Sequence, residues 1–194
     1  KSSVVELLSA VLEEAGCKTA FASTIHFKIG EKFERNLFKM TMPGRFFLQH
    51  FLRNAVSAHC THAIVEMTSE GARQFRHKFI ELDALIFTNL SPEHIESHGS
   101  YEKYVAAKVS IALALEGSKK KNKVLIVNGD EKEAHKFLDV FSGKKFSYSK
   151  EDARNRAISD HGVSFDWNGI RIGSKLPGEF NLYNILAATT YAKA

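Results

Sequence analysis

Three short apolar runs in the sequence each lead into polar side chains of the kinds that hold ligands. These side chains are Glu66, Thr68 and Ser69 after the first run, Thr88 and Asn89 after the second, and Asn128 and Asp130 after the third. In an open parallel sheet, ligands bind beyond the carboxyl ends of the strands. Strand ends need polar loops in any case, so one such cluster alone is a weak signal. Three such clusters at one edge of the sheet predict a single crevice that combines carboxylate, hydroxyl and amide groups.

The first three residues, Lys1, Ser2 and Ser3, precede a helical pattern and have the residue types found at the end of a phosphate-binding loop. In such a loop the ammonium contacts the β- and γ-phosphates, the next hydroxyl binds Mg²⁺, and the helix N-terminus favours the anion. The glycine-rich part of the loop is absent from this sequence, and Lys-Ser-Ser is also an ordinary helix start. Both interpretations stay open on these residues alone.

Two groups of histidines have residue types that suit a zinc site. His94 and His98 are spaced to share one helical face, but Pro92 and Gly99 bracket them and favour a short turn instead. The segment 59–62, His-Cys-Thr-His, falls where a turn must join a helix to a strand. Histidines near loops are most often solvated or hydrogen-bonded, which is the alternative to metal binding in both places.

Lys108 follows aromatic and small residues within a helical pattern. One interpretation is a surface lysine whose stem covers apolar surface while the ammonium stays in water. The other is a lysine that faces the sheet crevice, loses its proton and becomes open to chemical modification. Periodicity does not choose between them.

The elements that would position these side chains alternate between strands and helices. The apolar runs 63–65, 84–87 and 123–127 are typical of strands covered on both faces, as in a parallel sheet. Helical patterns cover 4–12, the stretch opened by Pro43, 101–115, 131–141 and 180–194. Gly16 is expected to end the first of these helices. The segment 19–29 is expected to be one strand. Asn168-Gly169, between two alternating runs, predicts a hairpin. This order predicts an α/β fold with a doubly wound, mostly parallel sheet and a C-terminal β-hairpin before the last helix.

Composition agrees with one α/β domain in the 194 residues, of which 44% are hydrophobic and 25% charged. It excludes a disordered chain and a disulfide scaffold, and the two cysteines suggest a reducing compartment. No run is long enough to span a membrane, and no signal peptide is visible. The formal charge of +5 suits a phosphate-rich ligand or a nucleic acid, with basic loops expected at Lys119–Lys123 and Lys144-Lys145. Since the chain starts at Lys within a helical pattern, we expect a piece of a longer protein.

Taken in order, the polar blocks resemble the central ATP-binding domain of the Mur ligases, which build the peptide stem of peptidoglycan and whose relatives include folylpolyglutamate synthetase. The resemblance covers 1–194. The matching blocks are Lys1-Ser2-Ser3, Glu66-Met-Thr-Ser69, Phe87-Thr-Asn89 through His94, His98-Gly99, Tyr104 and Lys108, Asn128-Gly-Asp130-Glu131, and Gly178-Glu-Phe-Asn181-Leu-Tyr-Asn184.

Within the family, two further stretches resemble the ligase that adds the third stem residue to UDP-N-acetylmuramoyl-dipeptide. They are Thr41-Met42-Pro43 and the run from Ser69 to Arg76. The sequence departs from the family pattern at four positions. Met42 replaces a hydroxyl residue, Thr68 replaces a serine, Glu70 replaces a histidine, and Glu93 replaces an aspartate. The changes at 42 and 70 bear on the muramoyl acceptor more than on the ATP chemistry.

The resemblance implies specific roles for these residues. It implies three catalytic groups. Lys1 would neutralise phosphate oxygens, and His94 would hold a second Mg²⁺. Lys108 would be carbamylated by CO₂ and would orient that second metal. Mg²⁺ ligands are then Ser2, Glu66, His94 and Lys108. ATP contacts are Lys1, Ser2, Ser3, Asn128, Asn181 and Asn184, and acceptor contacts are Thr41, Thr68, Gln74 and Arg76. For Asp130, Glu131 and His98 we expect structural roles.

The implied activity is an ATP- and Mg²⁺-dependent ligase. The substrate carboxylate becomes an acyl phosphate, and the amine of an amino acid then displaces phosphate. The resemblance implies that the protein acts in the cytoplasm as a monomer. Its expected partners are a nucleotide-sugar peptide substrate and an amino acid, and no nucleic acid or membrane. The uridine-nucleotide and amino-acid domains of the family lie outside it. Two alternatives remain, which are another family ligase acting on a different acceptor and a non-catalytic nucleotide- or nucleic-acid-binding module.

Overall fold

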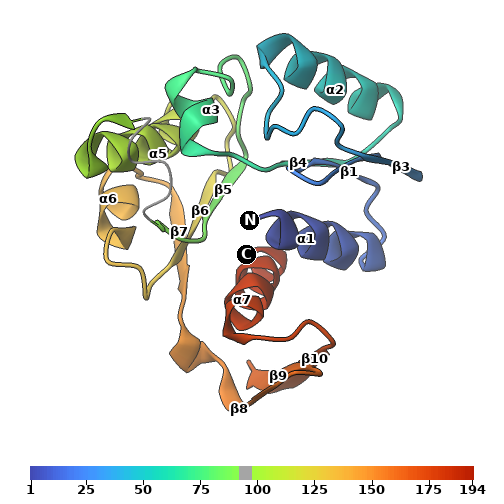
Figure 1. The fold of residues 1–194 in the computed structure, drawn as a ribbon, viewed down its shortest axis with the longest axis vertical. Coiled ribbons are helices and arrows are strands. Elements are labelled where there is room, and N and C mark those ends of the chain that lie inside the picture. Colours follow the sequence, from blue (N-terminus) through green and yellow to red (C-terminus); the bar gives the residue numbers. More distant parts are fainter. Residues whose placement is uncertain (92–97) are drawn as a thin grey trace.

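The central strands fall into two sheets, of which the first contains one parallel pair and the second contains two (Figure 1). We describe them from a computed structural model, in which residues 1–91 and 98–194 are described. The first sheet has the order β3-β2-β1-β4 and the second the order β5-β6-β7. Their bounds are β1 Thr19–Ala22, β2 His26–Ile29, β3 Lys32–Arg35, β4 His62–Val65, β5 Ala84–Phe87, β6 Val124–Asn128 and β7 Lys144–Tyr148.

Helices cover both faces of these sheets, which confirms the doubly wound α/β prediction. On one face of β6, Leu125 and Val127 pack with residues of α5 and α6, and on the other Ile126 packs with residues of α7. Helix α1 packs against α7 and β1. The helix bounds are α1 Ser2–Glu14, α2 Arg45–Ser57, α3 Ser69–Arg73, α5 Tyr101–Glu116, α6 Ala134–Asp139 and α7 Glu179–Lys193, with a 3₁₀ turn at Lys150–Asp152.

Helix α1 ends where the sequence predicts. Gly16 has φ +84°, and its N–H donates to the carbonyl of Glu13 over 2.9 Å. The N–H of Cys17 donates to the carbonyl of Leu12, also over 2.9 Å. These two bonds satisfy carbonyls at the helix end, and the left-handed conformation between them favours glycine.

The segment 19–29 is not one strand, so that prediction is wrong. It forms an antiparallel hairpin of β1 and β2. The hydroxyl of Ser23 accepts from the N–H of His26 at 2.9 Å and from the N–H of Ile25 at 3.2 Å, which closes the turn. Side-chain hydroxyls that bond backbone groups two or three residues ahead favour turns, and this signal lies inside an apparently continuous β pattern.

The C-terminal hairpin is confirmed and belongs to a third, antiparallel sheet of order β10-β9-β8. Asn168 and Gly169 both have positive φ, 49° and 80°, as a type I′ turn requires. The strands are β8 Arg154–Ser159, β9 Gly162–Trp167 and β10 Ile170–Ser174. Val163 and Phe165 of β9 are buried in one hydrophobic cluster with residues of α7, so this sheet packs against that helix.

Three further expectations need correction. Lys144 and Lys145 do not lie in a basic loop, because they belong to the edge strand β7. The helix expected over 131–141 is shorter, since α6 covers only Ala134–Asp139. Pro43 precedes α2 by two residues, with Gly44 as the N-cap. The charges of Lys144 and Lys145 suit their place in the edge strand β7, because charged side chains discourage pairing with another chain.

In the described residues, no helix has the length and apolar character needed to cross a membrane.

Candidate functional site

The start of α1 and the end of β4 meet through a buried carboxylate. The Ser2 hydroxyl donates to Oε2 of Glu66 at 2.6 Å, and the backbone N–H of Thr24 donates to the same oxygen at 2.8 Å. Glu66 is only 5% exposed. A hydroxyl and a carboxylate side by side are hard oxygen donors of the kind that Mg²⁺ prefers.

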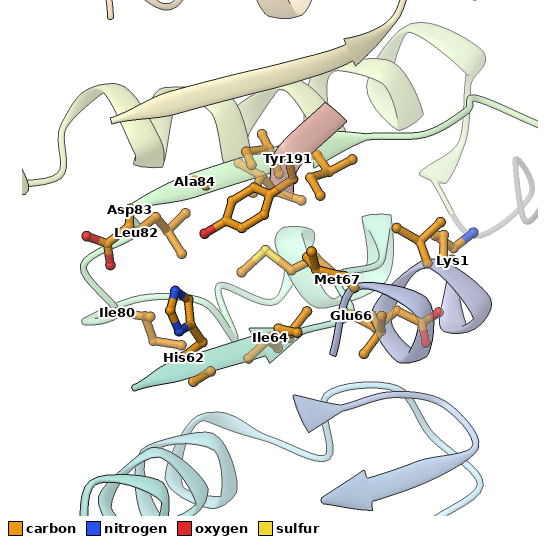
Figure 2. A pocket seen from close by; sticks show the side chains of 18 of the residues that line it. Lys1, His62, Ile64, Glu66, Met67, Ile80, Leu82, Asp83, Ala84 and Tyr191 are labelled. Atoms are coloured by element: carbon orange, nitrogen blue, oxygen red, sulfur yellow. The ribbon is translucent and has the colours of Figure 1, made fainter. Parts of the chain in front are cut away.

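These groups lie at one end of a cavity of about 840 Å³ between β4 and β5. Lys1, Glu66, Thr88, Asn89 and Lys108 are among its lining residues. Figure 2 shows Lys1 and Glu66 at this end, opposite the end where His62, Leu82 and Asp83 lie. The expected convergence of polar strand ends is therefore confirmed for β4 and β5.

The polar cluster after β6 does not line this cavity. The side-chain amide of Asn128 donates to the carbonyl of Thr88 at 3.0 Å, and its oxygen accepts from the N–H of Asp130 at 3.1 Å. Both functional atoms of Asn128 thus hold the ends of β5 and β6 together. Asp130 in turn accepts from the backbone N–H of Lys150 at 2.7 Å and from the Tyr183 hydroxyl at 2.9 Å. Burial and this bond to Asp130 raise the pKa of Tyr183 to about 12.

Lys108 faces the crevice and is not a surface lysine. It is 8% exposed and lines the cavity, and its Nζ donates to the carbonyl of Asn89 at 2.9 Å. The Nζ also lies 5.1 Å from the centre of the Tyr104 ring. Helix α5 thereby presents an amine to the same opening as Lys1 and Glu66.

The zinc interpretation gains no support. His94 lies outside the described residues, and so does Glu93. His98 is buried, with Nε2 3.1 Å from the Ser69 hydroxyl, as a structural role predicts. In the part of the chain that the structure describes, no three His, Cys, Asp or Glu side chains come close enough to hold a metal ion.

Three of the residues expected to contact the acceptor form one network. The Arg76 guanidinium donates to the carbonyls of Thr41 at 3.1 Å and Met42 at 2.8 Å. It also donates to Oε1 of Gln74, whose amide donates to Glu70. Thr68 instead caps α3 by accepting from the N–H of Gly71 at 3.1 Å.

Thr24 connects the network of Arg76, Thr41 and Gln74 to the end of the cavity where Glu66 lies. The hydroxyls of Thr24 and Thr41 lie 2.5 Å apart, and the Thr24 N–H contacts Glu66. Sequence reasoning missed Thr24 because it placed this residue inside a continuous strand. The hydroxyl-rich Ala-Ser-Thr turn was the signal that marks it.

Glu70, which replaces a histidine of the family pattern, carries a stable negative charge beside this network. Hydrogen bonds from Arg73, at 2.8 and 3.2 Å, hold the pKa of the Glu70 carboxyl below its usual value. Met42 is buried and has φ 56°. Two of the four positions that depart from the family pattern therefore contact this network, Met42 through its bond from Arg76 and Glu70 through its bond from Gln74.

The two asparagines of α7 contact each other. Asn184 donates to Oδ1 of Asn181 at 3.0 Å, and Asn181 donates to the carbonyl of Pro177 at 2.7 Å. Neither is among the residues that line the large cavity. The structure thus groups the predicted residues into three sets, which are Lys1, Ser2 and Glu66 at one end of the cavity, the network of Thr41, Gln74 and Arg76, and the pair of Asn181 and Asn184.

A lysine and a serine at a helix N-terminus, beside a buried carboxylate at the end of a parallel strand, are the arrangement expected of an α/β domain that binds phosphate. Residues 1–192 match the family described as the Mur ligase middle domain. The chain belongs to that family.

Relatives in the family agree with this assignment. The chain is 31% identical, over its whole length, to the UDP-N-acetylmuramyl-tripeptide synthetase of Roseiflexus sp. (strain RS-1), of which it spans 42%. It is 32% identical over 97% of its length to the UDP-N-acetylmuramoyl-L-alanyl-D-glutamate--2,6-diaminopimelate ligase of Chlamydia muridarum (strain MoPn / Nigg), of which it spans 40%. The chain therefore spans about two fifths of the length of these curated relatives.

Solved structures share the fold. A UDP-N-acetylmuramoyl-L-alanyl-D-glutamate--2,6-diaminopimelate ligase matches with a TM-score of 0.80 at 21% identity, over 100% of this chain and 41% of the other. MurF from Acinetobacter baumannii matches with a TM-score of 0.72 at 16% identity, over 99% and 40%.

Proposed function

We propose that residues 1–194 form the ATP-binding middle domain of a ligase that adds an amino acid to UDP-N-acetylmuramoyl-dipeptide. The longer protein acts as a cytoplasmic monomer in peptidoglycan precursor synthesis, with its uridine-nucleotide and amino-acid domains outside this chain. The hydrogen bond between Ser2 and Glu66, next to Lys1 and Lys108 in one cavity, carries the proposal. The names of the relatives supply the acceptor.

The end of the cavity where Lys1, Ser2 and Glu66 lie suits phosphoryl transfer, which depends mainly on positioning and charge neutralisation. Bound Mg²⁺ supplies positive charge on the phosphate oxygens of ATP. Ser2 and Glu66 would hold it with hard oxygen atoms, and the Lys1 ammonium would neutralise phosphate oxygens beside them. An acceptor carboxylate oxygen bonds to the γ-phosphorus as ADP leaves. The amine of the amino acid then attacks the acyl carbon, and inorganic phosphate leaves as the amide forms.

Lys108 is proposed to act as a carbamate. The neutral amine attacks the carbon of CO₂ and loses one proton to water, so a cation becomes an anion that still carries one N–H. That N–H keeps the hydrogen bond to the Asn89 carbonyl, while the new carboxylate faces the cavity. With His94, it would hold a second Mg²⁺ near the acyl phosphate.

The remaining groups would bind the adenine of ATP and the acceptor substrate. Asn184, with Asn181 nearby, would read adenine through amide hydrogen bonds, Asn128 would line the same pocket, and Ser3 would lie next to the phosphates. Thr41, Thr68, Gln74 and Arg76 would position the acceptor. The network from Arg76 through Thr41 and Thr24 to Glu66 supports this division, because it ties the acceptor side to the phosphate side.

The decisive experiment measures phosphate release by the full-length protein. Muramoyl-dipeptide, ATP, Mg²⁺ and a panel of amino acids are supplied, and the amide product is identified by mass. We expect phosphate and product in equal amounts with at least one amino acid. No release with any of them would overturn the acceptor assignment.

Glu70 favours one alternative, a family ligase with a different carboxylate acceptor. Its carboxylate already uses the donors of Arg73 and Gln74, and it adds negative charge where an anionic acceptor would lie. Phosphate release with folates or other carboxylate acceptors, but not with muramoyl-dipeptide, would favour this alternative. Steep salt-dependent retention on DNA would instead favour a nucleic-acid module, and we expect none.

A further inference from the structure

Strand β3 leaves one hydrogen-bonding edge of the first sheet open. It is the outer strand of the order β3-β2-β1-β4, it pairs with β2, and no described strand lies on its other side. All four of its residues, Lys32–Arg35, are exposed. Figure 1 shows β3 at the rim of the molecule, away from the second sheet. An exposed strand edge is a template for pairing with another chain unless its side chains prevent it.

The backbone of β3 directs the polar groups of alternate residues to this open edge. The N–H of Asn36, just after the strand, donates to the carbonyl of Ile25 at 2.8 Å, so these two residues form a hydrogen-bonded pair. In an antiparallel ladder, hydrogen-bonded and non-hydrogen-bonded pairs alternate along the strands. Counting back along β3, the N–H and C=O groups of Arg35 and Phe33 therefore point away from β2. Those of Glu34, between them, point toward β2.

The side chains of this segment are complementary to a second copy of the same segment. Its sequence is Glu31-Lys32-Phe33-Glu34-Arg35, with opposite charges at equal distances on the two sides of Phe33. In two copies that pair antiparallel about Phe33, Lys32 therefore faces Glu34. Glu31 faces Arg35 in the same way, and each contact occurs twice. Because opposite charges on facing residues stabilise paired strands, this pattern selects a second copy of β3 as the occupant of the edge.

Backbone and side chains agree on this register. Pairing about Phe33 places its outward N–H and C=O groups opposite those of Phe33 in the second copy, so the two residues exchange both hydrogen bonds. A register centred on Glu34 would satisfy the same outward groups, but it would bring two carboxylates together. A register centred on Lys32 would bring two ammonium groups together. Of these three registers, only the one centred on the uncharged Phe33 combines bonded backbone with opposed charges.

The Phe33 ring is already ordered by neighbours on its own chain. It is 54% exposed, and its centre lies 6.1 Å from that of the buried Phe21 ring, edge to face, and 4.5 Å from that of the His26 ring. Pairing therefore costs little further side-chain entropy at this position. Contact between two Phe33 rings also removes apolar surface from water.

The outer strand of the second sheet, β7, lacks this complementarity. Its residues, Lys144–Tyr148, include two lysines and no acidic side chain. Two copies of β7 would bring positive charges together without opposing ones, as expected of an edge that resists pairing. The contrast between the two edges makes β3 the specific candidate.

We infer that two copies of this protein associate through antiparallel pairing of their β3 strands about a two-fold axis at Phe33. Both copies use the same surface, as in most symmetric dimers, and their first sheets become one continuous sheet. One short strand from each copy makes a small interface, so we expect a dissociation constant of about 10–100 μM. The protein is therefore a monomer when dilute and pairs as its concentration rises.

This pairing leaves the proposed reaction to each single chain. Strands β3 and β4 are the opposite edges of the first sheet, and Glu66 follows the carboxyl end of β4. The contact between Ser2 and Glu66 thus lies at the other edge of the sheet from the pairing strand. The inference does not depend on the proposed function, and the failure of either leaves the other standing.

Charge reversal in the full-length protein tests both the pairing and its register. Lys32→Glu places acidic side chains opposite each other in the pair, and Glu34→Lys places basic ones there. We expect each variant alone to raise the dissociation constant about tenfold or more, measured by sedimentation velocity over a concentration series. An equimolar mixture of the two variants restores every opposite pair, so we expect mixed dimers with nearly the original affinity. Lys144→Glu on β7 is the matched control and should leave self-association unchanged.

The mixture distinguishes a contact between copies from the ion pair within one chain. Lys32 and Glu34 of one chain lie 2.7 Å apart, and both variants break that ion pair, in the mixture as well as alone. Recovery of dimers in the mixture therefore requires contact between two chains in this register. Three outcomes would overturn the inference. They are no self-association of the unaltered protein about tenfold above the expected dissociation constant, unchanged affinity in the single variants, and no recovery in the mixture.

Discussion

The hydroxyl of Ser2 lies 2.6 Å from Oε2 of Glu66, 64 positions further along the sequence. This contact fixes the first turn of α1 against the carboxyl end of β4. It also aligns the hydroxyl with a carboxylate that is almost fully buried. A pair of oxygen donors held in this way requires little rearrangement to accept a divalent cation.

Replacing Ser2 with alanine is expected to weaken Mg²⁺ binding. The substitution removes one hard oxygen donor and a hydrogen bond that positions Glu66. We expect the Mg²⁺ concentration for half-maximal phosphate release by the full-length protein to rise about 10- to 100-fold. Ser57→Ala, at the exposed end of α2, is the matched control. An unchanged Mg²⁺ requirement in Ser2→Ala would exclude Ser2 as a ligand.

Lys108→Ala is expected to reduce turnover strongly and to respond to added carboxylic acid. Turnover should fall about 10- to 100-fold, because a metal-orienting anion is lost, and a short acid such as acetate should restore part of it by filling the vacated space. Lys103→Ala on the exposed side of the same helix should leave turnover unchanged. Full activity of Lys108→Ala, measured by phosphate release, would contradict the carbamate.

Arg76→Ala is expected to act on the acceptor more than on ATP. Loss of the guanidinium leaves the Thr41 and Met42 carbonyls without their donor and releases the segment that holds them. We expect the KM for the acceptor to rise about tenfold and the free energy of unfolding to fall by about 1–3 kcal/mol. The KM for ATP should change little, and Arg53→Ala on α2 is the control. Equal effects on both KM values would place Arg76 elsewhere in the mechanism.

The sequence predicts the buried and locally encoded parts of the fold better than the exposed parts. The run 124–127 and the Asn168-Gly169 turn carry strong local signals, and both are confirmed. The strands β3 and β8 are exposed along their whole length, so no apolar alternation marks them. Their pairing depends on neighbours distant in the sequence, which periodicity does not report.

The same distinction holds for the candidate site. Strand-end polarity correctly brings Glu66 and Asn89 to one cavity, because parallel topology alone places them there. The burial of Lys108 depends on how α5 is rotated against the sheet, and the sequence leaves that choice open. Thr24 enters through a turn that a continuous β pattern conceals. Tertiary placement, and not residue type, decides these cases.

His77 is expected to make stability fall in mild acid. The imidazole is 7% exposed, and burial, together with nearby Lys78, lowers its pKa below the ordinary value of 6.5. Between the folded and unfolded pKa values the unfolded chain binds more protons, so the free energy of unfolding decreases as the pH falls below about 6.5. His77→Leu should flatten this part of the profile in denaturant titrations at several pH values. Exposed His50→Leu should retain it, and an equal slope in wild type and His77→Leu would contradict the assignment.

Tyr148→Phe is expected to stabilise the protein. The side chain is 2% exposed, and among the described residues its hydroxyl has no hydrogen-bond partner. Burial raises the pKa of this tyrosine, which reflects the same lack of compensation for lost water. Removing the oxygen should increase the free energy of unfolding by about 1 kcal/mol. Tyr183→Phe, which loses the bond to Asp130, should decrease it by a similar amount. Chemical denaturation of both variants gives the two signs, and a loss of stability in Tyr148→Phe would mean that its hydroxyl is hydrogen-bonded in solution.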